Sequence, residues 1–335
     1  MEYSRVLKDS NYSRVYEIAT LTKDIVKKEN ISQLEFNNAF IIKHFFEKYK
    51  AKSVSIPRNF PSFILVQLQD LGIPIFIEKA SIFSQREQKR ESEIKLIRRA
   101  NRASAHGLLI AQSALLNSKI ISGYLYLDGS RLTSERLRKM IEISLMEKGA
   151  FADETIVAGG LQATDPHQIG YGPLRSNELI IVDIFPRLKA YGYYGDMTRT
   201  FLKGKANTHQ RNLVHCVRMA QKLAISKVKA NVSGYSLHRS VRNYFKAAGY
   251  RTEQRVDSNS FVGFIHSTGH GLGLDIHEAP SIGVSKNRLK RNHVITIEPG
   301  LYYPEIGGCR IEDVFLVEDN GVKKLSKFNY QWELP

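Results

Sequence analysis

The sequence has few cysteines, no long apolar run and no low-complexity segment. Cys216 and Cys309 are its only cysteines, too few for a disulfide framework, and this favours a reducing cytoplasm. No apolar stretch is long enough to span a bilayer, and the N-terminal MEYSRVLKDSNYSRVY lacks the basic-then-apolar order of a secretory signal. We therefore expect a soluble globular protein with no membrane partner, which its hydrophobic content of 42% suits.

Acidic residues are also in short supply, so that the formal net charge is +16. A basic surface can bind nucleic acid through phosphates alone. However, no aromatic-interleaved strand or recognition-helix pattern accompanies the tightest basic cluster, which is formed by Lys286, Arg288, Lys290 and Arg291. We therefore expect a solvated basic surface and no nucleic-acid partner, with attraction of anionic peptides as a side effect.

Hydrophobic periodicity predicts a small mixed α/β domain over residues 1–85. No acid–base set of residues appears in it, so we expect a packing or lid role. Its predicted elements are helices over Ser13–Glu29, Phe36–Tyr49 and about Ser62–Leu71, and strands over Val54–Ile56 and Ile73–Ile77.

Residues 86–335 form the second predicted domain, entered through the charged linker Gln85–Glu93. Gly149 and Gly249 each close a pair of helices that leads into strands, and we interpret the domain as two related halves. The predicted helices cover 93–116 and begin again after Thr133 or Ser134, near Thr208 and near Ser236. The predicted strands are Thr155–Ala158, Leu179–Phe185, Val262–Ile265, Val294–Ile297 and Arg310–Val317.

A histidine-rich stretch, FIHSTGHGLGLDIHEAP over Phe264–Pro280, is the most informative part of the chain. It contains His266, His270 and His277, with glycines on both sides of His270. Imidazole is the commonest nitrogen ligand of catalytic metals, and glycines let a substrate approach the backbone closely. An isolated histidine is usually neither a ligand nor a base, so a surface loop is the alternative for this stretch taken alone.

Four carboxylates have the spacing to complete a metal site with His270. Asp183 ends one apolar strand and Asp196 follows thirteen residues later, whereas Glu298 ends another strand and Glu312 follows fourteen residues later. Taken alone, each pair could equally be two ordinary acidic residues in loops, with no role in metal binding. Together with one imidazole they offer an oxygen-rich environment that can hold two divalent ions about 3.5 Å apart, with a nucleophilic bridging water.

These residues resemble the pita-bread metallopeptidases, which include methionine aminopeptidases, aminopeptidase P and prolidase. The resemblance covers about residues 90–335 and is strongest to the proline-specific branch, through HSTGHGLGLDIHE at His266–Glu278 and DMTRTF at Asp196–Phe201. It implies an α+β pita-bread catalytic domain with pseudo-twofold halves, after a small N-terminal mixed α/β domain. It also implies a homodimer.

The resemblance further implies a role for each site residue. Asp183 would chelate one metal, His270 and Glu298 the other, and Asp196 and Glu312 would bridge both. The ions would be manganese, with cobalt or zinc as alternatives. The remaining roles are a substrate-facing His167, His266 and His277 at the scissile carbonyl and its oxyanion, Arg310 orienting the ligands, and Glu298 as acceptor of the water proton.

The function implied first is an Xaa-Pro aminopeptidase, which releases a residue that precedes proline. The alternatives are an Xaa-Pro dipeptidase, then a methionine aminopeptidase or a non-catalytic binding module of the same fold. In such modules the ligands are typically eroded, whereas all five are present here, which also disfavours a metal-free hydrolase such as creatinase.

Three departures from the family pattern bear on the substrate. The Asp183–Asp196 loop is two residues longer than usual, and the N-terminal domain is shorter than in typical aminopeptidase P. Ser281 stands where some prolidases carry an arginine that meets the dipeptide carboxylate. This predicts a preference for peptides that continue beyond proline, with Arg187 or Lys189 as alternative sources of the missing charge.

Overall fold

The computed structural model describes residues 12, 14–78, 82–254 and 261–335. The chain divides into two compact units that part between Ser84 and Gln85, and each is described separately. Within the described ranges, no helix is both long and apolar enough to cross a membrane.

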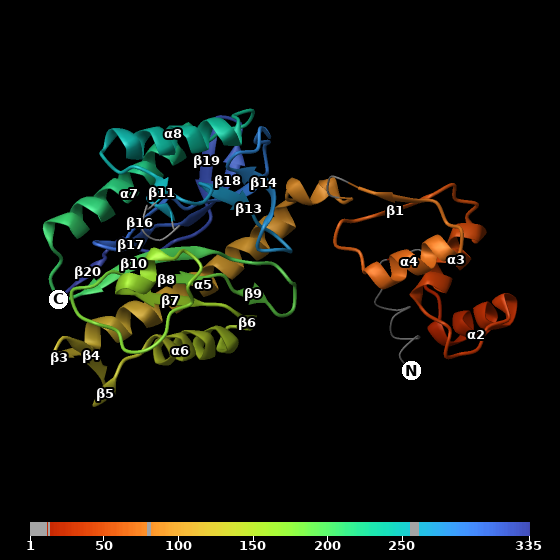
Figure 1. Ribbon diagram of the computed structural model, residues 1–335, viewed down its shortest axis with the longest axis horizontal. Helices are drawn as coiled ribbons and strands as arrows, with labels where there is room; N and C mark the ends of the chain where they lie inside the picture. The colour runs from red at the N-terminus through yellow and green to blue at the C-terminus, as the bar shows by residue number, and fades with distance from the viewer. Residues whose placement is uncertain (1–11, 13, 79–81, 255–260) are drawn as a thin grey trace. The chain divides into compact units, whose positions relative to one another are not determined.

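The described residues of the N-terminal unit form three helices and a two-stranded parallel sheet (Figure 1). The Asn37 side chain accepts a hydrogen bond from the Ala39 amide and so caps the second helix. Ala39, Leu68 and Ile73 form its small core. The first predicted helix starts later than expected, and Ser13 lies outside the described residues. The elements are α2 (Ile18–Glu29), α3 (Asn38–Lys48), β1 (Val54–Ile56), α4 (Ser62–Asp70) and β2 (Ile75–Ile77).

The larger unit begins with a helix pair that packs against an antiparallel three-stranded core. Thr133 caps the second helix by accepting a hydrogen bond from the Arg136 amide. Leu108, Ile141 and Val182 belong to the shared core of helices and strands. The elements are α5 (Glu91–Asn117), α6 (Ser134–Glu147), β7 (Ile156–Gly159), β8 (Ile180–Ile184) and β10 (Met197–Lys203), with β20 (Glu333–Leu334) beside β10.

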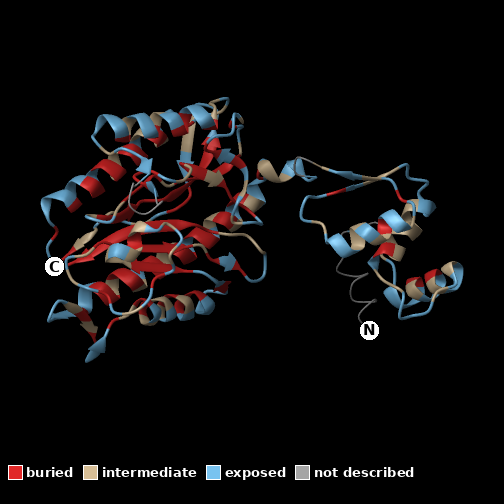
Figure 2. Ribbon diagram, in the orientation of Figure 1, coloured by how far each residue is buried: buried red, intermediate tan, exposed pale blue. Residues whose placement is uncertain are grey.

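The second half repeats this order of helix, helix and antiparallel strands, as the sequence predicts. Its core joins Val217 and Val241 of the helices to Ile295 and Phe315 of the strands. Figure 2 shows the helices exposed on one side while the strands are buried. The elements are α7 (Thr208–Lys227), α8 (Gly234–Ala247), β13 (Gly269–Gly271), β14 (Glu278–Ile282), β15 (Val294–Ile297), β18 (Asp313–Glu318) and β19 (Gly321–Lys324).

The remaining elements are short, and their strands form one three-stranded and three two-stranded sheets among the described residues. They are the 3-10 helices η1 (Ser84–Glu87) and η2 (Gly160–Thr164), and the strands β3 (Lys119–Ile121), β4 (Tyr124–Leu127), β5 (Ser130–Arg131), β6 (Ala150–Phe151), β9 (Arg187–Leu188), β11 (Glu253–Gln254), β12 (Phe261–Val262), β16 (Gly300–Tyr303) and β17 (Gly307–Arg310).

Two strand predictions need correction. The strand expected over Arg310–Val317 is two strands, because the chain leaves the β16–β17 hairpin at Arg310 and joins β15 only from Asp313. Between them, the Glu312 amide donates to the Thr198 carbonyl of the first half, so packing between the halves interrupts the strand. The strand expected over Val262–Ile265 ends at Val262, since Gly263 takes a φ of 93° that breaks the extended run.

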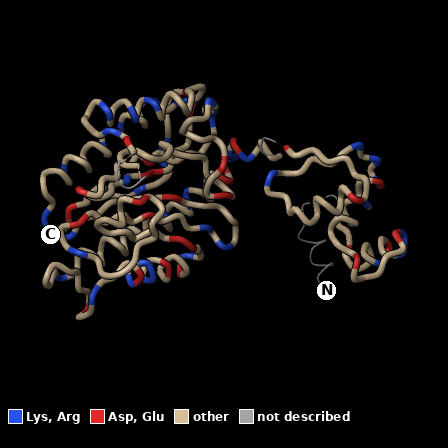
Figure 3. The backbone as a smooth tube through the Cα atoms, in the orientation of Figure 1, with Lys and Arg blue, Asp and Glu red and all other residues tan. Residues whose placement is uncertain are grey.

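The predicted linker Gln85–Glu93 belongs to the larger unit, and not all of its charges are solvated. The side chain of Lys89 is 2% exposed and forms an ion pair with Glu278. Elsewhere the excess positive charge is dispersed, and Figure 3 shows Lys and Arg spread along both units.

Candidate metal centre and substrate cavity

The four carboxylates come from two hairpins, one in each half. In β8–β10, Asp183 pairs with Thr198, and Asp196 immediately precedes β10. In β15–β18, Ile297 pairs with Asp313 at the end of the ladder, and Glu298 and Glu312 each lie one residue beyond this last pair. All four acids line one cavity of about 1090 Å³. The expected equivalence of the two pairs holds for the hairpins, but the pairing of the acids differs.

His270 faces these carboxylates from β13. Its Nε2 lies 3.5 Å from Asp196 Oδ2 and 3.3 Å from Glu298 Oε1. Its Nδ1 is 3.1 Å from the Gly271 carbonyl, which can only accept, so Nδ1 carries the proton and Nε2 presents a lone pair. The neighbouring glycine serves packing, because a Cβ on Gly269 would lie 2.0 Å from the Thr296 carbonyl oxygen.

The charges of this cluster call for a cation. Burial, together with the charges of Asp183 and Glu298, holds the pKa of Asp196 well above its usual range. Burial and Asp196 do the same to the pKa of Glu312, and burial raises that of Glu298 to about 7 although Arg310 opposes it. Asp183 Oδ1 is buried without a hydrogen-bond partner. Single donor atoms of Asp196, His270 and Glu312 lie within 4.8 Å of one another, so the set fits a divalent ion.

Each half donates hydrogen bonds to a carboxylate of the other half. Arg310 Nη2, from β17, lies 2.8 Å from Asp183 Oδ2 on β8. Conversely, Thr198 Oγ1 on β10 donates to Glu312 Oε2 at 2.7 Å. Within the second half, Thr296 Oγ1 donates to Glu298 Oε1 at 3.1 Å. The carboxylates are therefore held in place by fixed hydrogen-bond donors.

The three other predicted histidines line the same cavity. His167 and His277 are exposed to it, and the His277 ring lies edge-on to His270 with 4.4 Å between centroids. His266 is more enclosed, and burial followed by the charge of Arg310 lowers its pKa to about 3, so its ring is neutral. Their contacts with substrate stay predictions.

Tyr302 is a site residue that the sequence analysis missed. His266 Nδ1 lies 2.8 Å from the Ser267 carbonyl and therefore donates, which leaves Nε2 to accept from the Tyr302 hydroxyl at 2.8 Å. That hydroxyl accepts from Arg310 Nη1 at 2.8 Å. A Cβ on Gly300 would lie 2.4 Å from it, so the glycine makes room for this chain. The available clue was position, because Tyr302 follows Glu298 by four residues.

The cavity wall contains charged residues that the sequence analysis did not assign to the site. Glu278 is held by Lys89 and by Arg86 Nη2, the latter at 2.6 Å. Arg288 and Lys290 line the cavity. Arg187 and Lys189, proposed above as substitute cations, are not among the described lining residues; Arg187 Nε instead donates to the Gly192 carbonyl.

Comparison with known proteins agrees with this geometry. Residues 95–319 match metallopeptidase family M24. An Xaa-Pro dipeptidase of Pyrococcus furiosus is 32% identical over 242 residues, covering 71% of this chain and 63% of the relative. An Xaa-Pro dipeptidase of Pyrococcus horikoshii is 30% identical over 289 residues, covering 84% and 76%. The chain thus spans less than two thirds of the first relative's length.

Solved structures give the same answer for the fold. The prolidase of Pyrococcus horikoshii OT3 matches with a TM-score of 0.72 at 30% identity, over 84% of this chain and 77% of that one. The predicted α+β pita-bread fold is confirmed, and the match over residues 95–319 spans both halves of the larger unit. The chain belongs to metallopeptidase family M24.

Proposed function

We propose that this chain is a metal-dependent peptidase that cleaves the bond preceding proline, with Xaa-Pro dipeptides as its substrates. The observation that carries the proposal is the convergence of Asp183, Asp196, His270, Glu298 and Glu312 on one cavity. The choice of dipeptides is supported by the relatives, which are named Xaa-Pro dipeptidases. The proposal therefore prefers the Xaa-Pro dipeptidase, which the sequence analysis gave as an alternative, to the Xaa-Pro aminopeptidase that it gave first.

The same five residues would hold two divalent ions, with Asp183 at one, His270 and Glu298 at the other, and Asp196 and Glu312 between them. Such ions supply a water that is nucleophilic at neutral pH. Oxygen ligands with one imidazole suit manganese and also admit cobalt or zinc. A cytoplasmic homodimer completes the proposal.

The chain's own side chains have separate tasks in this scheme. The Glu298 carboxylate accepts the proton of the attacking water and returns it to the leaving prolyl nitrogen. Arg310 keeps Asp183 oriented through their 2.8 Å contact. His277, exposed in the cavity, donates to the scissile carbonyl oxygen. For His266 to do the same, its proton must move from Nδ1 to Nε2, and Nε2 must give up the hydrogen bond from Tyr302.

A dipeptide brings its own carboxylate into the cavity, where it needs a cation. Ser281, which pairs with His270 across the β13–β14 ladder, offers none. Arg288 and Lys290 line the same cavity and are the proposed partners. The absence of an arginine at 281, in a cavity of about 1090 Å³, favours an aminopeptidase acting on longer peptides as the second candidate.

Hydrolysis of Ala-Pro, Ala-Pro-Ala and Ala-Ala-Ala by the manganese-loaded protein tests both candidates. The dipeptidase proposal predicts a higher kcat/KM for Ala-Pro than for Ala-Pro-Ala, and no cleavage of Ala-Ala-Ala. Double replacement of Arg288 and Lys290 by Met should raise KM for Ala-Pro, while Ser281→Arg should lower it. Faster cleavage of Ala-Pro-Ala would assign the chain to the aminopeptidases instead. Cleavage that survives complete metal removal would contradict both.

A further inference from the structure

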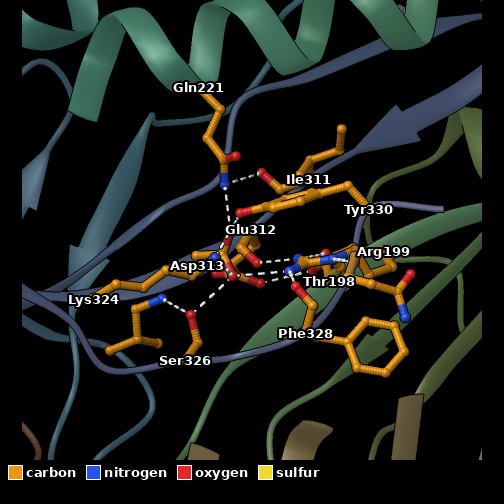
Figure 4. Close-up of polar contacts among 12 residues, drawn as sticks. Thr198, Arg199, Gln221, Ile311, Glu312, Asp313, Lys324, Ser326, Phe328 and Tyr330 are labelled. Carbon is orange, nitrogen blue, oxygen red and sulfur yellow. Dashed lines mark hydrogen bonds and ion pairs between the residues drawn. The ribbon is translucent and has the colours of Figure 1, made fainter. Parts of the chain in front are cut away.

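A polar cluster with a buried centre lies behind Glu312, and Lys324 and Tyr330 form its more exposed edge. It consists of Arg199, Gln221, Asp313, Lys324, Ser326 and Tyr330 and is called the Asp313 cluster below (Figure 4). Gln221 and Asp313 are fully buried, and Arg199 is 3% exposed. None of the six is among the described residues that line the catalytic cavity. Burying so many polar groups is costly unless each is paired, so their arrangement demands an explanation.

The cluster holds the backbone at the two places where the glutamates of the candidate metal centre are attached. Gln221 Nε2 lies 3.2 Å from the carbonyl oxygens of both Ile297 and Ile311. These residues immediately precede Glu298 and Glu312 in the sequence. The side-chain amide nitrogen of Gln221 on α7 therefore contacts the carbonyl groups that directly precede both glutamates.

Arg199 secures the other side of Glu312. Residues Ile311 and Glu312 lie between β17 and β18, outside any ladder, so their backbone groups need other partners. Arg199 Nη1 donates to the Glu312 carbonyl at 2.7 Å and to the Thr198 carbonyl at 2.8 Å. The strand break is thus held from β10 by Arg199 and from α7 by Gln221.

Asp313 fixes both of these donors. Its Oδ2 accepts from Gln221 Nε2 at 3.1 Å and from the Tyr330 hydroxyl at 2.6 Å. Its Oδ1 accepts from Arg199 Nη2 at 2.9 Å and from the Ser326 hydroxyl at 2.8 Å, and Lys324 Nζ lies 2.9 Å away. Five donor groups surround the roughly four acceptor sites of this carboxylate, and the two hydrogens of Gln221 Nε2 are shared among Asp313 and the two carbonyls, so the contacts within the cluster depend on one another.

From these contacts we infer that Gln221, Asp313 and Arg199 are positioning residues that set where the Glu298 and Glu312 carboxylates stand, and thereby the affinity for metal. The inference rests on the proposed function, since it takes these glutamates as ligands. Partners of metal ligands typically contribute about 10–100-fold in metal affinity. The cluster acts through the backbone next to the ligands and does not touch substrate.

Gln221→Met tests this, because methionine has a similar length and donates no hydrogen bond. Its matched control is Gln210→Met on the same helix, since Gln210 is also buried but bonds only the Asn177 carbonyl and the helix cap. Calorimetric titration of the metal-free proteins with Mn²⁺ should show affinity about tenfold or more weaker for Gln221→Met and within twofold of wild type for Gln210→Met. The Tm of the two metal-free variants should fall by similar amounts.

Asp313→Asn is the second variant, should Gln221→Met fail to fold, and it should weaken Mn²⁺ binding in the same way. Lys324→Met is its control, because Lys324 contacts Asp313 and Tyr330 but none of the backbone beside the glutamates. Equal loss of affinity in Gln221→Met and Gln210→Met, or wild-type affinity in both Gln221→Met and Asp313→Asn, would overturn the inference. If the wild type itself binds no Mn²⁺, the proposed function fails first.

Discussion

The two halves of the larger unit use the same hairpin for different acids. In the first half, two aspartates are attached out of register, since Asp183 pairs with Thr198 and not with Asp196. In the second half, the two glutamates each lie one residue beyond the last pair of the β15–β18 ladder, which is Ile297 with Asp313. The second half also provides His270, His266 and His277, whereas the first half provides His167. The two halves therefore share a fold, but the second half contributes more of the candidate site histidines.

This difference shows that neither half could form the site alone. Asp183 depends on Arg310 of the second half, and Glu312 depends on Thr198 of the first. Because like charges at close range raise one another's pKa, four carboxyl groups can converge in their ionised form only where fixed donors and a cation compensate the charge. The Arg310–Asp183 and Thr198–Glu312 contacts place those donors where the two halves meet.

The largest loss of activity should follow from single substitutions of the candidate bridging acids, one in each half. Asp196→Ala and Glu312→Ala should each lower kcat/KM by at least about a thousandfold, because several kcal/mol of charge stabilisation depend on the metals. Peptide hydrolysis measured together with bound metal checks this. If either variant kept full activity without metal, the proposed site would be wrong.

The second largest effect should come from replacing the cavity histidines, and it should be larger for those of the second half than for His167 of the first. His266→Ala and His277→Ala should each lose about 10²–10³ in kcat while retaining their metals, since each is expected to act on the reacting carbonyl. His167→Ala, on the exposed loop of the first half, should lose less. Steady-state kinetics with metal analysis decide between these roles. Loss of metal from His266→Ala or His277→Ala would make that residue a ligand or a support.

Acid should destabilise the second half first, because the buried histidines of the described structure, His238 and His293, both lie there. Burial lowers the pKa of each from 6.5 to about 4. The unfolded chain therefore takes up these protons first, and stability falls as pH drops from about 6.5 to about 4. For His238 the loss is on the order of 2–3 kcal/mol.

Unfolding by denaturant at several pH values measures this, and His238→Gln should flatten the dependence in that window. Hydrogen exchange should show the strands of the second half opening before those of the first. A pH profile unchanged by the substitution would assign the acid sensitivity to other groups.

The smallest effect should come from one cross-half hydrogen bond. Thr198→Val removes the donor to Glu312 and should weaken metal binding about tenfold, the usual worth of a hydrogen bond to a charged group. Thr155→Val is the matched control, because the Thr155 hydroxyl is buried without a partner and valine should not lower the Tm. Equal metal affinity in Thr198→Val and wild type would mean that the halves are not coupled through this contact.

Local chemistry made much of this protein predictable from its sequence. The Thr133 cap, the helices and most strands follow from periodicity and capping, which act within a few residues. The donor types also follow, because one imidazole and four carboxylates suit divalent metals whatever the fold. The structure brings the five candidate ligands to one cavity, and their role as metal ligands stays a prediction.

Only the tertiary structure decided how these residues are supported. The strand break at Glu312, the Tyr302 hydroxyl between Arg310 and His266, and the Lys89–Glu278 pair depend on contacts that periodicity does not encode. Gln221 meets Ile297 and Ile311 across 76 and 90 residues of chain. Such contacts form because buried polar groups must find partners wherever packing brings them together, so residues distant in sequence share one satisfied arrangement.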